Sequence, residues 1–467
     1  MTLNNLHNVY FLGIGGIGMS ALARWFKNIG HKVTGYDKTQ TPLTDQMVKE
    51  GIEIHFEDDP KLINPDVIRS PETSLIIYTP AIPKDHKEYN YLIAKGQRIF
   101  KRSEVLGTIT ANHFTVAIAG THGKTSTSSM IAHILKSSGR NCAAFVGGIM
   151  VNYDSNLILP TNEEDCIVVA EADEFDRSFL RLSPNVAVVT AADPDHLDIY
   201  GDSQNLKQSF RDFIKKIEKS GKLFIKERVA DELELSGLNI DIETYATQGT
   251  NVKAKSIRIE NGVFVFEYSN STQDIGPLRL HFPGRHNIEN ALAAISVSLH
   301  LGISENQIKA AIESYRGVRR RFEKIFENDQ SVYYDDYAHH PEEIRAFLSA
   351  LKELLPGRKI TAIFQPHLYT RTRDFADGFA ESLQIADQVI LIPIYPAREI
   401  PIDGINSGLL LQKISGTDKQ LVKKEDVLEK LSNMRIDVLA TIGAGDIDQL
   451  IAPIKVMLEK RYEPVHN

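Results

Sequence analysis

The chain is poor in cysteine and in long apolar runs, and both absences narrow what it can be. Its 467 residues include only two cysteines, Cys142 and Cys166, so we expect no disulfide framework and a reducing compartment. No apolar run approaches the length of a membrane span, and the first eight residues lack the basic segment of a secretory signal. These features predict a cytoplasmic protein without membrane insertion.

An excess of positive charge is also missing. The net charge of -8 argues against broad affinity for nucleic acid or for anionic membranes. A hydrophobic content of 42% and a charged content of 24% are ordinary for a globular protein, and the length is too great for one core. Composition leaves the oligomeric state open between a monomer and a homodimer.

Alternating apolar and amphipathic runs predict an α/β fold with parallel sheets. Residues 1–105 show the βαβ pattern, and a strand at 115–119 starts a second α/β unit. Hairpin-like strands within 250–282 predict a small antiparallel sheet, and strands alternate with helices again near the C-terminus. We therefore predict three domains, over residues 1–105, 106–318 and 319–467.

The segment 115–126 is the most informative part of the sequence. An apolar strand runs into a glycine turn that ends in Lys124 and Thr125 and opens a helix expected over Ser126–Ser138. The usual P-loop spacing is shortened, because Ile118 stands where its first glycine belongs. Lysine and threonine at the helix entrance favour a nucleoside triphosphate site over an ordinary glycine turn, with the Thr125 hydroxyl on Mg²⁺. The candidate nucleotide-binding residues are Gly120, Thr121, His122, Gly123, Lys124, Thr125 and Ser126.

A second glycine loop, Gly13-x-Gly15-x-x-Gly18, follows the first predicted strand, and Asp37 ends the next one. This pattern satisfies the dinucleotide-binding fingerprint and, taken alone, indicates a nicotinamide or flavin site. The same turn can place any diphosphate on a helix N-terminus, so both interpretations stay open.

Acidic residues follow two further apolar strands of the central region. Glu171 directly ends one strand, where a second ligand for Mg²⁺ is expected, although a solvated acidic loop is the common alternative. His196 lies among Asp193, Asp195 and Asp198 after another strand, which makes a metal contact plausible. Mg²⁺ prefers oxygen ligands, and no cysteine pair or second histidine supports zinc.

Three polar clusters follow strands that we expect at Val332–Asp336, Ile360–Phe364 and Val438–Ile442. In chain order the clusters are Asp335–Pro341, Phe364–Asp374 and Thr441–Asp446. Ligands of open α/β sheets bind beyond the carboxyl ends of the strands, so a shared site is predicted there. Helix capping by Asp374 and Asp446 is the alternative.

At these residues the chain resembles the Mur ligase family over nearly its whole length. The matching motifs are Gly13-Ile-Gly-Gly-Ile-Gly-Met-Ser20, Ala119-Gly-Thr-His-Gly-Lys-Thr125, Glu171-Ala-Asp-Glu174, Asp195-His196-Leu-Asp198, Pro283-Gly-Arg-His286-Asn287 with Asn290, Arg320-Arg321-Phe322, Asp336-Tyr-Ala-His-His-Pro341 and Phe364-Gln-Pro-His367.

The resemblance implies an ATP-dependent ligase that joins L-alanine to the carboxylate of UDP-N-acetylmuramate through an acyl-phosphate, in peptidoglycan precursor synthesis. It implies a Rossmann-like N-terminal domain, a central P-loop ATPase domain and a Rossmann-like C-terminal domain that brings the amino acid. A family member that ligates a whole peptide and, from another class, an NAD-dependent oxidoreductase are the alternatives. The residues implied for the UDP-sugar are Gly13, Gly15, Gly16, Ile17, Gly18 and Asp37.

The resemblance also assigns roles to single residues. Lys124 would hold the β- and γ-phosphates, Thr125 and Glu171 would coordinate one Mg²⁺, and His196 would reach a second. The remaining implied contacts are those of His286 and Asn290 with adenine, of Arg321 with ATP, and of His339 and Arg371 with the alanine and the UDP-muramoyl substrate.

Two departures from the family pattern bear on these roles. Leu368 follows His367 where the family usually has arginine, so one expected cationic contact to substrate is missing. Arg371, Arg373 or Arg398 could replace that contact. Ala191 and Ala192 stand where the family usually has an asparagine.

Overall fold

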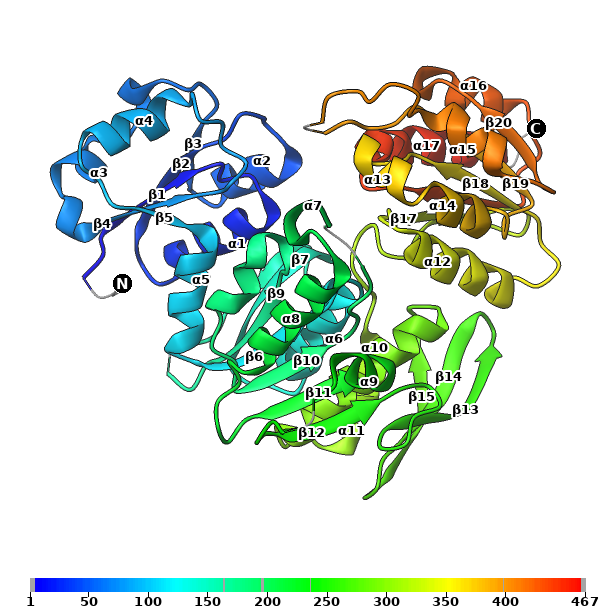
Figure 1. Ribbon diagram of the computed structural model, residues 1–467, viewed down its shortest axis with the longest axis horizontal. Helices are drawn as coiled ribbons and strands as arrows, with labels where there is room; N and C mark the ends of the chain where they lie inside the picture. Colours follow the sequence, from blue (N-terminus) through cyan, green and yellow to red (C-terminus); the bar gives the residue numbers. More distant parts are fainter. Residues whose placement is uncertain (1–4, 163, 195–196, 236, 398, 463–467) are drawn as a thin grey trace, which may run out of the picture. The chain divides into compact units, whose positions relative to one another are not determined.

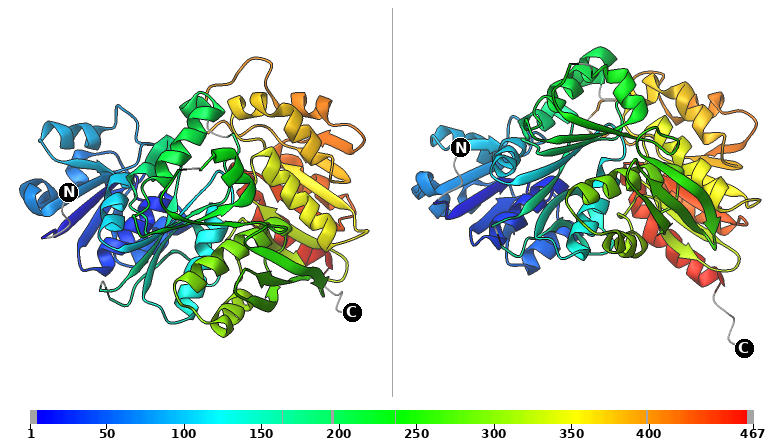
Figure 2. Two further views of the ribbon diagram at one scale, coloured as in Figure 1. Left: turned by 60° about the horizontal axis from the view of Figure 1, so that its bottom comes forward. Right: turned by 90° about the horizontal axis from the view of Figure 1, so that it is seen from below.

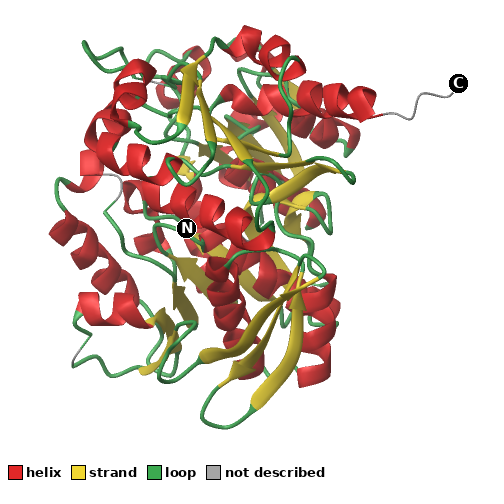
Figure 3. Ribbon diagram, turned by 90° about the vertical axis from the view of Figure 1, so that its right-hand side faces the viewer, coloured by secondary structure: helices red, strands yellow, loops and turns green. Residues whose placement is uncertain are grey.

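The computed structural model describes residues 5–162, 164–194, 197–235, 237–397 and 399–462. Helices and strands alternate along the chain (Figure 3), and the strands form four sheets, so the predicted α/β class is confirmed. Residue contacts divide the chain into two units. Unit 1 comprises Met1–Lys255, Glu267–Gly276 and Glu289–Tyr315, and unit 2 comprises Ser256–Phe266, Pro277–Ile288 and Arg316–Asn467. The domain boundaries predicted near residues 105 and 318 stay predictions.

The N-terminal sheet of unit 1 is parallel and has the strand order β3-β2-β1-β4-β5 (Figure 1). The strands are β1 (Asn8–Leu12), β2 (Lys32–Tyr36), β3 (Glu53–His55), β4 (Ser74–Tyr78) and β5 (Ile99–Lys101). The helices are α1 (Ile17–Asn28), α2 (Pro42–Lys49), α3 (Pro65–Arg69), α4 (Lys87–Ala94) and α5 (Arg102–Ala111). The order reverses at β1, so the loop after β1 opens on the crevice where such sheets bind ligands.

The central sheet has the order β12-β11-β10-β6-β9-β7-β8, and helices lie on both of its faces (Figure 2). Its strands are β6 (Phe114–Ala119), β7 (Cys142–Met150), β8 (Ser155–Ile158), β9 (Ile167–Ala172), β10 (Val186–Val189), β11 (Lys222–Lys226) and β12 (Asp241–Tyr245). The helices are α6 (Lys124–Ser137), α7 (Leu197–Tyr200), α8 (Ser203–Ile214), α9 (Glu227–Leu233), α10 (Arg285–His300) and α11 (Glu305–Ser314). All named pairings are parallel except that of the edge strand β8 with β7.

Helix α6 begins two residues earlier than the sequence predicts. Gly123 adopts a left-handed conformation with φ 83° and ends the glycine turn, so Lys124 and Thr125 lie in the first turn of the helix and not before it. Their side chains are therefore held by a rigid element.

The two sheets of unit 1 share one apolar core. A single cluster of buried side chains contains residues of both, and Trp25 of α1 packs against Phe145 of β7 with ring centroids 5.6 Å apart. Burying an indole ring this completely removes a large apolar surface from water. The N-terminal and central sheets are thus packed as one body.

The predicted small antiparallel sheet is confirmed. Its strands are β13 (Lys253–Glu260), β14 (Val263–Ser269) and β15 (Asp274–Leu280), in that order.

The sheet of the C-terminal region has the order β16-β17-β21-β18-β19-β20. Its strands are β16 (Glu323–Glu327), β17 (Val332–Asp336), β18 (Ile360–Phe364), β19 (Gln388–Leu391), β20 (Asp418–Leu421) and β21 (Val438–Ile442). Its helices are α12 (Pro341–Leu354), α13 (Tyr369–Asp374), α14 (Ala376–Leu383), α15 (Ser407–Lys413), α16 (Val427–Ser432) and α17 (Ile451–Tyr462). Strand β16 pairs antiparallel with β17, and the other pairings are parallel. Strands β17, β21 and β18 are neighbours, so the three polar clusters lie at one sheet edge.

Cys142 and Cys166 are buried free thiols. Within the part of the chain that the structure describes, no helix combines the length and the apolar character that crossing a membrane requires.

Candidate functional site

The glycine turn after β6 is packed tightly against its neighbours. Gly120 has φ 138°, and a Cβ on it would lie 2.2 Å from Thr190 Oγ1 and 2.8 Å from the backbone nitrogen of Ala191. A Cβ on Gly123 would lie 2.8 Å from Asn290 Oδ1. Neither contact tolerates a side chain, so glycine is required at both positions.

The segment after β10 holds this turn mainly through its backbone. Thr121 N–H donates to the carbonyl of Ala191 at 3.1 Å, and Asp193 N–H donates to Thr121 Oγ1 at 3.2 Å. The Thr190 hydroxyl donates to the carbonyl of His122. These bonds need no asparagine side chain, so alanine at 191 and 192 is compatible with an ordered turn.

Lys124 is a buried cation with a buried partner. Its Nζ donates to Glu174 Oε2 at 2.7 Å and to the carbonyl of Gly120 at 2.6 Å, and the side chains of Lys124 and Glu174 are 14% and 1% exposed. Burial alone would lower the pKa of Lys124, but the carboxylates of Glu174, Asp173 and Glu171 raise it above its ordinary range. Lys124 is therefore charged, and a phosphate that binds it competes with Glu174.

Thr125 and Glu171, the two oxygen ligands that the sequence predicts for Mg²⁺, lie side by side, and their contact with the ion stays a prediction. Thr125 Oγ1 donates to Glu171 Oε1 at 2.9 Å, and the Gly147 N–H donates to Glu171 Oε2 at 2.7 Å. Among the described residues, no three His, Cys, Asp or Glu side chains group around a point that could hold a metal. A hydroxyl and one carboxylate beside a phosphate loop nevertheless suit Mg²⁺, which takes its other ligands from phosphates and water.

Two residues of the predicted metal cluster, Asp195 and His196, lie outside the described residues, so the metal contact of His196 stays a prediction. Asp193 is described, and its carboxylate pairs with Arg228.

Hydrogen bonds within the N-terminal domain hold the first glycine loop in place. The N–H groups of Gly13 and Ile14 donate to the carbonyl of Tyr36 at 2.8 and 2.9 Å, and Gly15 N–H donates to Asp37 Oδ2 at 2.7 Å. Helix α1 follows Gly16 without a side-chain cap, so N–H groups of its first turn are available to a ligand. The contacts of this loop and of Asp37 with a UDP-sugar stay predictions.

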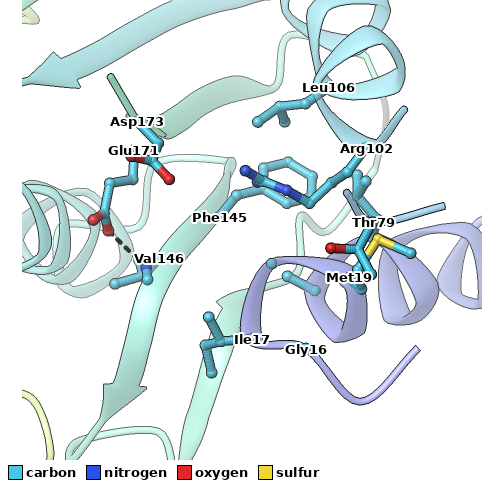
Figure 4. Close-up of a pocket in the computed structure, with 14 residues that line it drawn as sticks. Gly16, Ile17, Met19, Thr79, Arg102, Leu106, Phe145, Val146, Glu171 and Asp173 are labelled. Atoms are coloured by element: carbon cyan, nitrogen blue, oxygen red, sulfur yellow. Dashed lines mark hydrogen bonds between the residues drawn. The ribbon is translucent and has the colours of Figure 1, made fainter. Parts of the chain in front are cut away.

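A cavity of about 260 Å³ lies between this loop and Glu171 (Figure 4). One wall consists of the first turns of α1 with Thr79, Arg102 and Leu106, and the other of Phe145, Val146, Gly147, Glu171 and Asp173. Both walls belong to unit 1. A ligand held on α1 can therefore extend toward the carboxylate beside the phosphate loop.

Arg102 is a site residue that the sequence analysis missed. It begins α5 and reaches into the cavity beside Phe145 (Figure 4). Its Nη1 lies 2.8 Å from the position that a Cβ on Gly18 would take. It has no hydrogen-bond or ion-pair partner among the described residues, so its charge is free for an anion at the N-terminus of α1. The one sequence feature that could have indicated Arg102 is its position directly after a strand of the parallel sheet.

In unit 2, Arg321 and His339 lie around Tyr337 and Glu343. The Arg321 guanidinium lies 5.1 Å from the centre of the Tyr337 ring and 3.7 Å from Glu343 Oε1. The His339 N–H donates to Glu343 Oε2 at 2.9 Å. Burial raises the pKa of the adjacent Asp336 to about 7, although Arg321 opposes this effect. The arrangement places cationic and titratable groups at the carboxyl end of β17.

The second cluster of unit 2 follows β18. The rings of His367 and His339 are 6.1 Å apart, and Arg371 in α13 is only 8% exposed. Leu368 has φ 68°, a conformation that costs a leucine free energy and that marks this bend as strained. The exposed Arg373 pairs with Asp374 at 2.7 Å. Of the two arginines that the structure describes here, Arg371 is therefore the better candidate for the missing cationic contact. Arg398 lies outside the described residues.

The capping alternative for Asp374 and Asp446 is wrong. The helices near them are preceded by Phe375 and Gly445, and Asp446 instead accepts a hydrogen bond from Gln365 Nε2 at 2.6 Å. That bond links the clusters after β18 and β21, as the shared-site prediction requires.

The two residues expected at adenine fall in different units. Asn290, in unit 1, accepts a hydrogen bond from Thr127 Oγ1 at 3.2 Å and lies beside Gly123 of the phosphate turn. His286, in unit 2, is half-buried next to Gly284. Their contacts with adenine stay predictions.

Three family profiles match consecutive parts of the chain. They are described as "Mur ligase family, catalytic domain" for residues 8–114, "Mur ligase middle domain" for 118–298 and "Mur ligase, glutamate ligase domain" for 320–447. The UDP-N-acetylmuramate–L-alanine ligase of Flavobacterium johnsoniae is 50% identical over 98% of this chain and 100% of its own length. The enzyme of the same name from Cytophaga hutchinsonii is 46% identical over 99% of each chain.

Solved structures agree with these matches. The UDP-N-acetylmuramate-alanine ligase of Thermotoga maritima superposes with a TM-score of 0.81 at 28% identity, over 97% of this chain and 99% of that one. A murein peptide ligase from Psychrobacter arcticus superposes with a TM-score of 0.70 at 22% identity, over 97% and 98%, which shows a shared fold.

The substitution Glu174→Gln tests the buried ion pair. It keeps a hydrogen bond to Lys124 but removes the compensating charge, so we expect a loss of about 1–3 kcal/mol in the free energy of unfolding. Saturating ATP supplies a new negative charge and should reduce this deficit. Thermal unfolding with and without nucleotide measures both values.

The control is Glu243→Gln, which weakens the ion pair with Lys222 (2.7 Å) at the amino end of β11, away from the turn. Its deficit should not depend on nucleotide. Equal deficits of the Glu174 variant in both conditions would contradict the competition between Glu174 and phosphate.

Proposed function

The chain belongs to the Mur ligase family, and we propose that it is an ATP-dependent ligase that joins L-alanine to the carboxylate of UDP-N-acetylmuramate. The alanine ligases that it resembles over their full length support this substrate pair. The product is a peptidoglycan precursor, and we expect the reaction to take place in the cytoplasm.

One observation carries the proposal: a single cavity of unit 1 lies between the glycine loop of α1 and Glu171, the hydrogen-bond partner of Thr125. The glycine loop of α1 forms one wall, and Glu171, bonded to Thr125 of the phosphate loop, forms the other. A sugar nucleotide whose diphosphate rests on α1 can direct its carboxylate toward the ATP phosphates. An NAD-dependent oxidoreductase needs one nucleotide loop and would leave Lys124 and Glu171 without a role.

The reaction needs ATP because the carboxylate of the sugar nucleotide does not react with an amine in water without activation. The carboxylate oxygen attacks the γ-phosphorus of ATP and releases ADP, which gives an acyl-phosphate. The alanine amine then attacks the acyl carbon, and inorganic phosphate leaves as the amide forms. The chain contributes positioning, charge compensation and the exclusion of water from the acyl-phosphate.

Lys124 and Arg102 have the clearest parts in this scheme. Lys124, charged and fixed in the first turn of α6, would bind the β- and γ-phosphates and stabilise the charge that moves onto ADP. Arg102 would hold the diphosphate of the sugar nucleotide at the N-terminus of α1. Mg²⁺ bound by Thr125 and Glu171, with His196 reaching a second ion, would neutralise phosphate oxygens.

The remaining roles fall to residues of both units. We propose that Asn290 and His286 contact adenine and that Arg321 contacts ATP. In unit 2, His339 and the buried Arg371 would contact the incoming alanine and the UDP-muramoyl substrate. Since Leu368 supplies no charge, Arg371 would supply the missing cationic contact.

The direct test supplies ATP, Mg²⁺, UDP-N-acetylmuramate and one amino acid or peptide at a time, and records product mass and phosphate release. We expect one alanine added per phosphate released. Turnover only with a peptide would favour the recycling reaction, and no ligation with any acceptor would refute the proposal.

In the same assay Lys124→Ala should lower turnover by about 10²–10³-fold, because a donor to the transferred phosphoryl group is lost. Circular dichroism checks that the variant is folded. Near-normal turnover by a folded variant would remove the phosphate loop from the mechanism.

Arg102→Ala should raise the KM for UDP-N-acetylmuramate by about tenfold or more and leave the KM for ATP unchanged, since a charge-assisted contact contributes about 1.5–3 kcal/mol. Arg98→Ala, which removes an exposed arginine of the same domain, is the control and should change neither constant. Calorimetry should show that wild type binds UDP-N-acetylmuramate and not NAD. An unchanged KM for the sugar nucleotide would exclude Arg102 from the diphosphate site.

A further inference from the structure

Asn156 of β8 joins the two walls of the cavity. Its side chain is 0% exposed, and its Nδ2 donates to the carbonyl of Ile17 at 2.5 Å and to Ser20 Oγ at 3.0 Å. Ile17 and Ser20 form the first turn of α1, directly after the glycine loop. Asn156 is thus hydrogen-bonded to two residues that precede it in the sequence by 139 and 136 positions.

Arg24 satisfies the other end of the Asn156 amide. Its Nη1 donates to Asn156 Oδ1 at 3.0 Å, while its Nε and Nη2 donate to the two carboxylate oxygens of Glu50 at 2.8 and 2.9 Å. Both donors and the acceptor of Asn156 are therefore used, and the bidentate pair with Glu50 fixes the plane of the guanidinium. Asn156 and Arg24 are buried while Glu50 is at the surface, and the hydrogen bonds of the two buried side chains favour one geometry.

The network connects with the opposite wall through the hairpin of β7 and β8. In the antiparallel pairing, Phe145 of β7 faces Leu157, the residue after Asn156. Phe145, Val146 and Gly147 line the cavity, and Gly147 N–H holds Glu171 at 2.7 Å. A displacement of Asn156 therefore changes the distance between the α1 loop and Glu171.

Apolar packing alone would not fix this distance. The contact between Trp25 and Phe145 holds the same elements together, but apolar burial has no preferred direction and tolerates small shifts. Directional hydrogen bonds to the first turn of α1 set its position along and around the helix axis.

We propose that Asn156 is a positioning residue, which sets the span between the diphosphate-binding turn of α1 and the reaction centre at Glu171. The inference rests on the proposed function, because that span matters only for a ligand that occupies both ends of the cavity. Asn156 itself does not line the cavity.

The test is Asn156→Ala, assayed as the intact enzyme below its unfolding temperature. We expect the KM for UDP-N-acetylmuramate to rise and kcat/KM to fall by about 10- to 100-fold, since a misplacement near 1 Å costs about 100-fold. The KM for ATP and the calorimetric affinity for ADP should not change. If Asn156 had a purely structural role, the variant would contain less folded enzyme. The apparent kcat would then fall, and the KM for the sugar nucleotide would stay unchanged.

A second variant keeps the test decisive if Asn156→Ala folds poorly. Ser20→Ala removes one acceptor of the Asn156 amide and should raise the same KM by a smaller factor. An unchanged KM in Ser20→Ala would contradict the inference even then. Where Asn156→Ala folds, the double variant should be no worse than Asn156→Ala alone, because both changes break one network. Additive losses would contradict the coupling.

Asn141→Ala is the matched control. Asn141 also bridges segments of the central domain, through Nδ2 bonds to the carbonyls of Asn162 and Glu164, but does not contact α1. Its KM for the sugar nucleotide should equal that of wild type. If wild type is active and Asn156→Ala keeps a normal KM, the inference alone fails; if wild type does not ligate UDP-N-acetylmuramate, the proposed function fails and the inference falls with it.

Discussion

The site depends first on a buried charge that must be compensated. Lys124 is fixed at the start of α6 with little access to water, and an unpaired ammonium there would cost several kcal/mol. Glu174 Oε2, 2.7 Å from Lys124 Nζ, supplies the opposite charge. The carboxylates of Asp173 and Glu171 add to this compensating negative charge. These carboxylates lie at the end of β9, next to β6 in the sheet. The same acidic strand end therefore stabilises the lysine and supplies Glu171, which accepts the hydrogen bond of Thr125.

The parallel arrangement of the sheets explains why residues of several strands meet at this strand end. Parallel strands bring the loops after their carboxyl ends to one edge, so residues far apart in sequence meet there. In unit 1 this edge carries the phosphate turn and Glu171, and in unit 2 it carries the clusters after β17, β18 and β21. In the proposed function, the set in unit 1 is assigned to activation of the carboxylate with ATP, and the set in unit 2 is assigned to the amino acid.

Much of this layout was accessible from the sequence, because its signals are local. Apolar strands followed directly by polar clusters predicted β17, β18 and β21 and the position of Glu171. Arg102 and Asn156 were not predicted, since their importance arises from contacts with α1 that no local pattern records. The start of α6 at Lys124 was also missed, because it depends on the left-handed conformation of Gly123. Local chemistry was thus predictable, and long-range positioning was not.

We propose that the carboxylate of UDP-N-acetylmuramate is activated by phosphorylation before alanine attacks. The most direct measurement follows oxygen atoms in a reaction whose substrate carries ¹⁸O in that carboxylate. Attack of this oxygen on the γ-phosphorus predicts that each phosphate released during ligation contains one ¹⁸O atom, while the other label stays in the amide. Amide formation with unlabelled phosphate would contradict the account.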